Sequence, residues 1–436
     1  MNTSGEAADQ VVRMSLEVGE AALKISGTGA KHLAVMLYAV LKAKKKTKAH
    51  HSPMRRKQRR KKMSKIKSAL YPVLQRARYA EFISKFEKAK KQPMADNKIL
   101  MYSTSKGRLG GNLLAIKNYI EKNGLDYDIT VAAGEDIPPA DKLASLMAQS
   151  KFILVDDYEP LVYVLRLREN QHLVQVWHAM GAFKRFGYGR ASAEKNSLTH
   201  KNYTEAIVSS PEIAPIYAEA FGIGESRIKP IGTPRTDVFF DCDYVAAAKE
   251  RLYSQYPLLR GKKICLFAPT FRGANVHDAE YPESFFDCEK FANALGTDWA
   301  VIIKMHPFIK KPVQIPKSVS NRVFDLSTER EINDILFITD VLVTDYSSVI
   351  FENAVIGNAC VLYAPDLEQY TDGRGFYFDY SDYSCGSVVY SFSELPQAVL
   401  AAKPGEAQRK FKERFVSLCD GNSSARFVET ILESKK

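Results

Sequence analysis

From Asn97 onward, short apolar runs alternate with longer segments whose apolar residues recur at helical spacing. Such runs, rich in β-branched and aromatic residues, predict buried strands, and the segments between them are long enough for helical crossovers between parallel strands. The first series of predicted strands is Lys98–Tyr102, Tyr127–Val131, Phe152–Val155, Leu173–Trp177, Ala206–Ser209 and Ile228–Ile231. Its predicted helices include Asn112–Lys122, Pro139–Gln149 and Ile213–Phe221.

A second series of the same kind follows. Its predicted strands are Lys263–Ala268, Trp299–Lys304, Arg322–Asp325, Val341–Thr344 and Ala359–Tyr363, and its helices lie near Pro282–Leu295, Glu331–Phe337 and Val349–Val355. Two such series predict an α/β protein with two facing Rossmann-like domains, over 96–240 and 241–415. A terminal helix is expected near Glu406–Ser434, so that 416–436 form a C-terminal helical segment.

The N-terminal part has a different character. Up to about residue 41, apolar residues recur at roughly helical spacing, with a break at Gly27–Gly29. The stretch from Lys42 to Lys67 then holds 14 Lys and Arg and no Asp or Glu, so the rest of the chain carries −2 of the formal net charge of +12. We expect a helical, then basic and disordered extension over 1–62, and amphipathic basic helices over 63–95.

Helices with a basic polar face fit an anionic membrane surface. A solvated linker is the plainer alternative, and nucleic acid is less favoured because no aromatic platform or known motif accompanies the charge. The six scattered cysteines form no CxxC pair, which favours a reducing compartment, and no run approaches the ~20 apolar residues of a membrane span. The sequence therefore predicts a cytoplasmic protein, peripheral on the inner face of the cell membrane.

One strand end carries a histidine. In Leu173–Arg185 a short apolar strand runs into Trp177-His178-Ala179-Met180-Gly181-Ala182, followed by Lys184. Ligands of open α/β sheets bind outside the carboxyl ends of strands, and a histidine there can accept a proton near neutral pH. The small residues leave room for a substrate and the cations attract phosphate. A structural histidine is the alternative.

Two further strand ends carry hydroxyl and guanidinium groups. They are Ile231-Gly232-Thr233-Pro234-Arg235-Thr236-Asp237 and Leu266-Phe267-Ala268-Pro269-Thr270-Phe271-Arg272. The planar fork of an arginine suits phosphate oxygens, so Arg235, Thr270, Phe271 and Arg272 are candidate substrate-binding residues. Solvated surface arginines are the alternative.

The last two motifs also follow buried strands. Lys304 and His306 precede Pro307, which ends the strand, and this histidine either donates to a leaving phosphate or caps the turn. Thr344-Asp345-Tyr346-Ser347-Ser348 leads into a helix, whose first N–H groups and dipole favour an anion, although serine is also a common N-cap. Since no DxD pair follows a strand, apart from Asp156-Asp157 earlier in the chain, we expect no essential metal or cofactor.

Together these motifs resemble the CDP-glycerol glycerophosphotransferases, which build teichoic acids and related capsule polymers in Gram-positive bacteria. The resemblance covers roughly Lys98 to Arg426 and rests on Gln175–His178, Gly232–Asp237, Ala268–Arg272, His306-Pro307, Thr344–Ser348 and Arg374–Asp379. Separately, Met1–Gln10 onward resembles, over about 45 residues, the start of a small accessory family of bacterial conjugative elements, which suggests a gene fusion; a poorly ordered leader is the alternative.

The resemblance implies a GT-B fold, a peripheral membrane association, and transfer of glycerol phosphate from CDP-glycerol to a lipid-linked acceptor with release of CMP. By motif, His178 would deprotonate the acceptor hydroxyl. His306, Arg235, Thr270, Ser347 and Ser348 would stabilise the pyrophosphate. The turn from Ala179 through Met180, Gly181 and Ala182 to Lys184 would contact the donor, and Phe271, Arg272, Lys304, Asp345 and Arg374 complete the expected substrate site.

One departure bears on the donor. Many members follow the Trp-His pair with Gly-Thr-Pro-Leu-Lys, where this chain has Ala179–Lys184. CDP-ribitol is therefore the nearest alternative donor. A nucleotide-sugar transferase or epimerase of the same fold remains a second enzymatic reading, and a basic nucleic-acid or conjugation accessory protein a non-enzymatic one.

Overall fold

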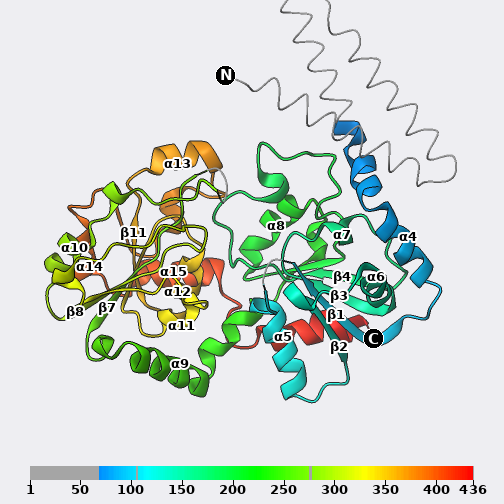
Figure 1. Ribbon diagram of the computed structural model, residues 1–436, viewed down its shortest axis with the longest axis horizontal. Helices are drawn as coiled ribbons and strands as arrows, with labels where there is room; N and C mark the ends of the chain where they lie inside the picture. Colours follow the sequence, from blue (N-terminus) through cyan, green and yellow to red (C-terminus); the bar gives the residue numbers. More distant parts are fainter. Residues whose placement is uncertain (1–67, 105–106, 274–276, 436) are drawn as a thin grey trace, which may run out of the picture. The chain divides into compact units, whose positions relative to one another are not determined.

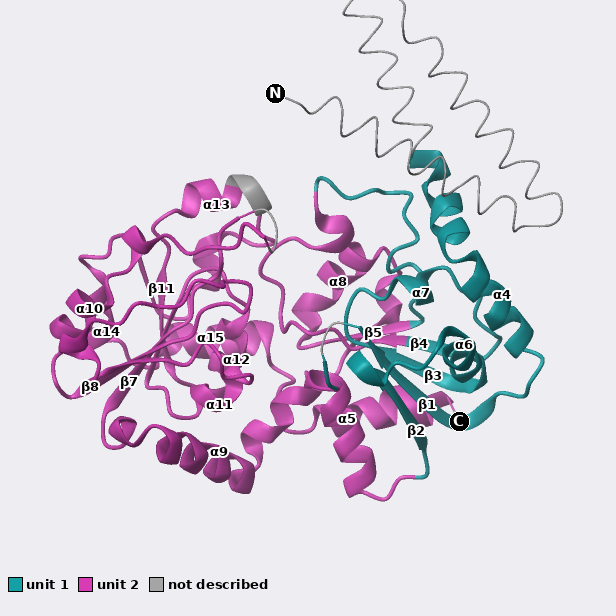
Figure 2. Ribbon diagram, in the orientation of Figure 1, with its two compact units in different colours: residues 1–108, 126–173, 191–204 teal, residues 109–125, 174–190, 205–436 magenta. Residues whose placement is uncertain are grey.

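The computed structural model describes residues 68–104, 107–273 and 277–435, without the side chains of 372–374. The predicted extension over 1–62 and the start of the amphipathic segment lie outside these ranges. The chain divides into two compact units, coloured separately in Figure 2. Unit 1 holds the residues up to 108 together with 126–173 and 191–204, and unit 2 holds 109–125, 174–190 and 205–436.

The strands form two six-stranded sheets, and every ladder with a described register is parallel. The first has the order β2 (Asp128–Ala133), β1 (Ala95–Ser103), β3 (Ser150–Val155), β4 (His172–Gln175), β5 (Glu205–Val208), β6 (Ile228–Pro230). The second has the order β12 (Ser387–Val389), β11 (Ala359–Tyr363), β10 (Val341–Thr344), β7 (Lys263–Phe267), β8 (Trp299–Ile303), β9 (Val323–Asp325). The α/β class expected from the alternating pattern is confirmed.

Unit 1 carries the described part of the amphipathic segment, which is a helix over 68–78 followed by α4 (Ala80–Ala89). Phe82 and Phe86 of α4 are buried, so its apolar face packs within the unit. Among the described residues of unit 1, the other α-helices are α6 (Ala140–Gln149) and the short α7 (Pro160–Tyr163). In the described part of the chain no helix is long and apolar enough to cross a membrane.

Unit 2 contains most of the described α-helices, all but α16 of them labelled in Figure 1. They are α5 (Gly111–Lys122), α8 (Ala214–Phe221), α9 (Cys242–Gln255), α10 (Cys288–Leu295), α11 (Ile332–Leu336), α12 (Val349–Ile356), α13 (Leu367–Arg374), α14 (Leu395–Ala401), α15 (Glu406–Phe415) and α16 (Ser423–Phe427).

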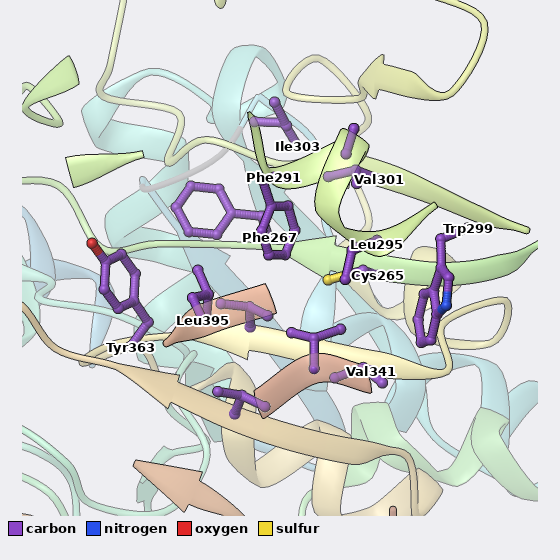
Figure 3. Packing of buried hydrophobic residues seen from close by; sticks show 14 of the residues in the cluster. Cys265, Phe267, Phe291, Leu295, Trp299, Val301, Ile303, Val341, Tyr363 and Leu395 are labelled. Carbon is purple, nitrogen blue, oxygen red and sulfur yellow. The ribbon is translucent and has the colours of Figure 1, made fainter. Parts of the chain in front are cut away.

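One face of the second sheet is covered by α10 and α14. Phe291 and Leu395 from these helices pack against Phe267 and Val301 of the sheet (Figure 3). Phe267 also stacks on Phe286, with ring centroids 3.8 Å apart. Because strands buried on both faces need apolar residues at every position, β7, β8 and β10 read as continuous apolar runs.

Two expected helices differ from the sequence reading. The helix expected over Pro282–Leu295 begins at Cys288, because Asp287 caps it by accepting a hydrogen bond from the backbone N–H of Lys290 at 3.0 Å. The single terminal helix expected near Glu406–Ser434 is wrong: α15 ends at Phe415, and Gly421, at φ +91°, separates it from α16. The helix has already ended at Val416, which has a φ of −138°, and the left-handed Gly421 turns the chain before α16.

Candidate active site

The histidine at the end of β4 sits on an unusual piece of backbone. Trp177 has a φ of +52°, which is rare for a bulky side chain and needs support from its surroundings. Its N–H donates to the side-chain oxygen of Gln175 at 2.8 Å, and its indole stacks on the His178 ring with centroids 4.4 Å apart. These contacts fix the backbone at the end of the strand. His178 itself is half-buried, so part of its ring remains accessible.

Asn112, in the first turn of α5, holds this backbone from one side. Its side-chain nitrogen donates to the carbonyls of Val176 at 2.7 Å and Trp177 at 3.0 Å. Its side-chain oxygen accepts the backbone N–H of Arg235 at 3.0 Å. Asn112 is buried and thereby joins the end of β4 to the turn after β6.

Arg235 holds the same backbone from the other side. One terminal nitrogen of its guanidinium donates to the carbonyl of His178, and the other pairs with the carboxylate of Glu352 on α12. Glu352 is 3% exposed, so this ion pair is nearly dry. Arg235, expected as a phosphate ligand, is thus placed beside His178 with both terminal nitrogens engaged by protein oxygens.

The turn after His178 is anchored by two tyrosines. Tyr217 donates to the carbonyls of Ala179 and Gly181, at 3.2 and 3.0 Å, and Tyr383 donates to the carbonyl of Ala182 at 2.7 Å. Met180 and Ala182, expected to contact the donor, are 1% and 3% exposed. Their side chains therefore pack inside unit 2.

Gly181 is fixed by its conformation and its neighbour. It has a φ of +62°, and a Cβ added there would lie 2.5 Å from the ring of Phe351 on α12. Only glycine fits both conditions. The turn at 179–182 is therefore shaped by direct packing on α12.

The turn continues into a short antiparallel contact with the motif 374–379. Lys184 pairs with Phe376 in an isolated bridge, and Arg185 donates its backbone N–H to the carbonyl of Gly375 at 3.1 Å. The Lys184 ammonium lies 5.9 Å from the centre of the Tyr370 ring. The side chain of Arg374, at the end of α13, lies outside the described part.

The turns after β7 and β10 meet at the point where the strand order of the second sheet reverses. Asp345 accepts the backbone N–H of Thr270 at 2.7 Å and a guanidinium N–H of Arg272 at 2.9 Å. Such switch points are where open α/β sheets bind ligands. The structure therefore brings three predicted residues together at the expected edge.

Arg272 is neutralised at this edge. Its guanidinium donates to both oxygens of Asp366, at 2.6 and 2.8 Å, in addition to Asp345. Burial alone would lower the pKa of Arg272, but the hydrogen bonds and charges of the two carboxylates raise it overall. Arg272 and Asp345 thus form a buried ion-pair cluster, in which a phosphate would compete with two carboxylates for the guanidinium.

The His306 ring lies beside Phe271, with centroids 4.8 Å apart. Its Nδ1 accepts the backbone N–H of Phe308 at 3.2 Å, as expected of a turn-capping histidine. A neutral ring that accepts at Nδ1 carries its proton on Nε2, so capping leaves the ring a donor. The two roles expected of His306 from the sequence, capping the turn and donating to a leaving phosphate, are therefore compatible.

The remaining predicted residues also follow their strands. Lys304 is 6% exposed and donates to the carbonyl of Ser327 at 3.0 Å, and burial lowers its pKa. Ser347 and Ser348 are half-buried and immediately precede α12, where Ser347 accepts the N–H of Val349 at 3.4 Å. Within the described ranges, no cluster of three His, Cys, Asp or Glu residues has the arrangement of a metal site.

Thr104, directly after β1, forms a further contact inside unit 1. The N–H and hydroxyl of Thr104 both donate to Glu159, at 2.6 and 3.1 Å. Glu159 is fully buried, and burial raises its pKa to about 7 against the effect of these two bonds. The sequence did not single out Glu159.

Comparison with known proteins decides the family. A family model described as CDP-Glycerol:Poly(glycerophosphate) glycerophosphotransferase matches residues 84–433. The chain belongs to this family. The family expected from the motifs is therefore confirmed.

The relatives of this chain include both a ribitol-phosphate and a glycerol-phosphate enzyme. The chain is 40% identical over 352 residues to the teichoic acid ribitol-phosphate polymerase TarL of Staphylococcus aureus, covering 78% of this chain and 63% of that protein. It is 31% identical over 302 residues to the teichoic acid glycerol-phosphate primase of Bacillus subtilis, covering 67% of this chain and 76% of that protein. The chain thus spans less than two thirds of the length of TarL.

Among solved structures, the wall teichoic acid polymerase TagF has the same fold. The TM-score is 0.67 at 19% identity, covering 86% of this chain and 98% of that chain. The expected GT-B type of fold is confirmed.

Sequence reasoning missed the residues that hold the site together: Asn112, Glu352, Asp366 and Tyr383. Glu352 had a usable signal, since it is a lone carboxylate in the apolar helix Val349–Ile356 and a charge buried there requires a partner. Asn112 follows two glycines at a helix start, but nothing local indicates which backbone it binds.

Proposed function

We propose that this chain transfers a polyol phosphate from a CDP-linked donor to a lipid-linked teichoic acid acceptor, with release of CMP. The preferred polyol in this proposal is ribitol. The observation that carries the proposal is the His178 ring, presented on a buttressed strand end in a member of this family. The preference for ribitol rests on the higher identity to the ribitol-phosphate polymerase, 40% against 31% for the glycerol-phosphate primase. CDP-glycerol is the second candidate, supported by the description of the matching family.

The reaction is a phosphoryl transfer. An acceptor hydroxyl attacks the β-phosphorus of the donor while the His178 imidazole takes its proton. The bond from the β-phosphorus to the bridging oxygen breaks, and CMP departs with that electron pair. Positioning and charge stabilisation supply most of the rate enhancement in such reactions.

The turns at the carboxyl ends of the strands of the second sheet supply the hydrogen-bond donors for the diphosphate. His306 offers the N–H at Nε2 to the leaving phosphate, and Ser347 and Ser348 offer hydroxyls at the start of α12, where the helix dipole also favours an anion. Thr270 is the further hydroxyl of this group, at the switch point of the sheet. Arg272 orders these turns through its two carboxylates.

A donor comparison tests this proposal. The full chain is incubated with a lipid-linked acceptor and either CDP-ribitol or CDP-glycerol, and CMP is quantified. We expect CMP from both, with kcat/KM at least about tenfold higher for CDP-ribitol. The reverse order would move the assignment to glycerol, and no CMP from either donor would refute a polyol-phosphate transferase.

We also propose a peripheral position on an anionic membrane, supported by the basic stretch from Lys42 to Lys67. Deletion of 1–62 should weaken sedimentation with anionic liposomes and leave turnover on a soluble acceptor unchanged. A shortened chain that sediments as before would place the attachment elsewhere.

A further inference from the structure

Glu352 is a buried carboxylate in α12, a helix in which every other residue except Asn353 is apolar. One of its oxygens accepts the guanidinium of Arg235, and the other has no hydrogen-bond partner among the described residues. Burying an ion pair costs several kcal/mol of desolvation, which its mutual attraction offsets only in part, so such a pair is weak evidence for stability. Its position next to His178 suggests another role.

Arg235 makes three hydrogen bonds, one of them to the backbone of His178 and the other two to side chains of α5 and α12. Its backbone N–H donates to Asn112, one terminal nitrogen donates to the carbonyl of His178, and the other is held by Glu352. Bidentate recognition of a phosphate would use the two terminal guanidinium nitrogens, which here donate to His178 and Glu352.

Asn112 completes the arrangement. Asn112 donates to the carbonyls of Val176 and Trp177, and Arg235 donates to the carbonyl of His178. The carbonyls of three consecutive residues thus each accept a hydrogen bond from one of these two side chains. The middle residue is the one held at φ +52°. The backbone that sets the direction of the His178 ring is therefore specified by side chains from α5, the turn after β6 and α12.

We infer that Asn112, Arg235 and Glu352 are positioning residues that aim His178 at the acceptor hydroxyl, and that Arg235 serves this role rather than binding the diphosphate. This inference rests on the proposed function. A displacement of about 1 Å at a reacting group can cost about 100-fold in rate. The loss should therefore appear in kcat and leave donor affinity unchanged.

Steady-state kinetics separate the two roles of Arg235. Asn112→Ala, Glu352→Ala and Arg235→Lys should each lower kcat about 10- to 100-fold with the donor KM within twofold of wild type. Glu352→Gln should lose less than Glu352→Ala, because its amide oxygen still accepts the guanidinium N–H. The matched control is Asp334→Asn, which breaks another carboxylate–arginine pair of unit 2, that with Arg251 at 3.0 Å, and should keep both constants within twofold.

A double-mutant cycle and a chemical probe complete the test. Arg235→Lys combined with Glu352→Gln should cost little more than the worse single variant, because both break one unit. The rate at which diethyl pyrocarbonate modifies His178, measured by mass spectrometry, should change several-fold in Asn112→Ala while the rate at His172 stays constant. This readout does not depend on turnover, so it tests the inference even if neither donor yields CMP.

Two results would overturn the inference. One is a donor KM raised tenfold or more by Arg235→Lys at unchanged kcat, which would make Arg235 a diphosphate ligand. The other is an unchanged modification rate of His178 in all three variants.

Discussion

Replacing Gly181 by alanine should disturb both the stability of the chain and the His178 turn. The residue adopts a φ of +62°, and the left-handed conformation costs a residue with a Cβ about 1–2 kcal/mol. The added methyl would also lie 2.5 Å from the fully buried ring of Phe351, and overpacking of this kind costs about 1–3 kcal/mol. We expect Gly181→Ala to lower the free energy of unfolding by the sum of these two costs, about 2–5 kcal/mol.

The two contributions can be separated by shortening the neighbour. Phe351→Leu removes the ring that meets the new methyl. The double variant should therefore lose about 1–3 kcal/mol less free energy of unfolding than the two single variants lose together. The assay is urea unfolding followed by tryptophan fluorescence, with CMP release measured on the same samples. Additive losses, or a Gly181→Ala protein as stable and active as wild type, would refute the packing of this turn on α12.

Three further predictions concern groups outside this turn. Because burial raises the pKa of Glu159 to about 7, its contribution to stability is full below about pH 4.5 and is lost as the pH rises through 7. Glu159→Gln should therefore be more stable than wild type at pH 8, by at most about 3 kcal/mol, and equally stable near pH 4. Thermal melts at the two pH values measure this difference. Asp366→Asn removes half of the charge that neutralises Arg272 and should cost about 2–4 kcal/mol in chemical denaturation; no loss would mean that the cluster is not needed for the fold. Tyr383→Phe keeps the ring stacked on Phe183 but removes the donor to Ala182, so unfolding midpoints should report a loss of about 1–2 kcal/mol, and a silent variant would contradict that anchoring bond.

The sheets and the placement of His178 could be predicted because they depend on local patterns. Buried parallel strands are written as continuous apolar runs, and the chemistry of α/β proteins gathers where those runs end. The runs ending before His178, Thr270 and Ser347 were therefore enough to place these residues at sheet edges. Helix α9 was missed because only Ala248 and Leu252 are buried along its length, which leaves a weak apolar period.

The charge partners could not be predicted, since they join residues that are distant in sequence. Arg235 and Glu352 are separated by 117 residues, and Arg272 and Asp366 by 94. Read locally, each arginine in a strand-end turn has the signature of a phosphate ligand. Only the folded topology shows that a carboxylate already occupies each guanidinium, and this changes the expected role of both arginines.

The most direct test of the central claim is CMP release by His178→Ala, compared with His172→Gln, which alters the histidine at the opposite end of the same strand. If His178 is the general base, its replacement should lower kcat at least about 100-fold without changing the affinity for the CDP-linked donor, and the control should retain wild-type turnover. A His178→Ala protein that releases CMP within a fewfold of the wild-type rate would contradict the account.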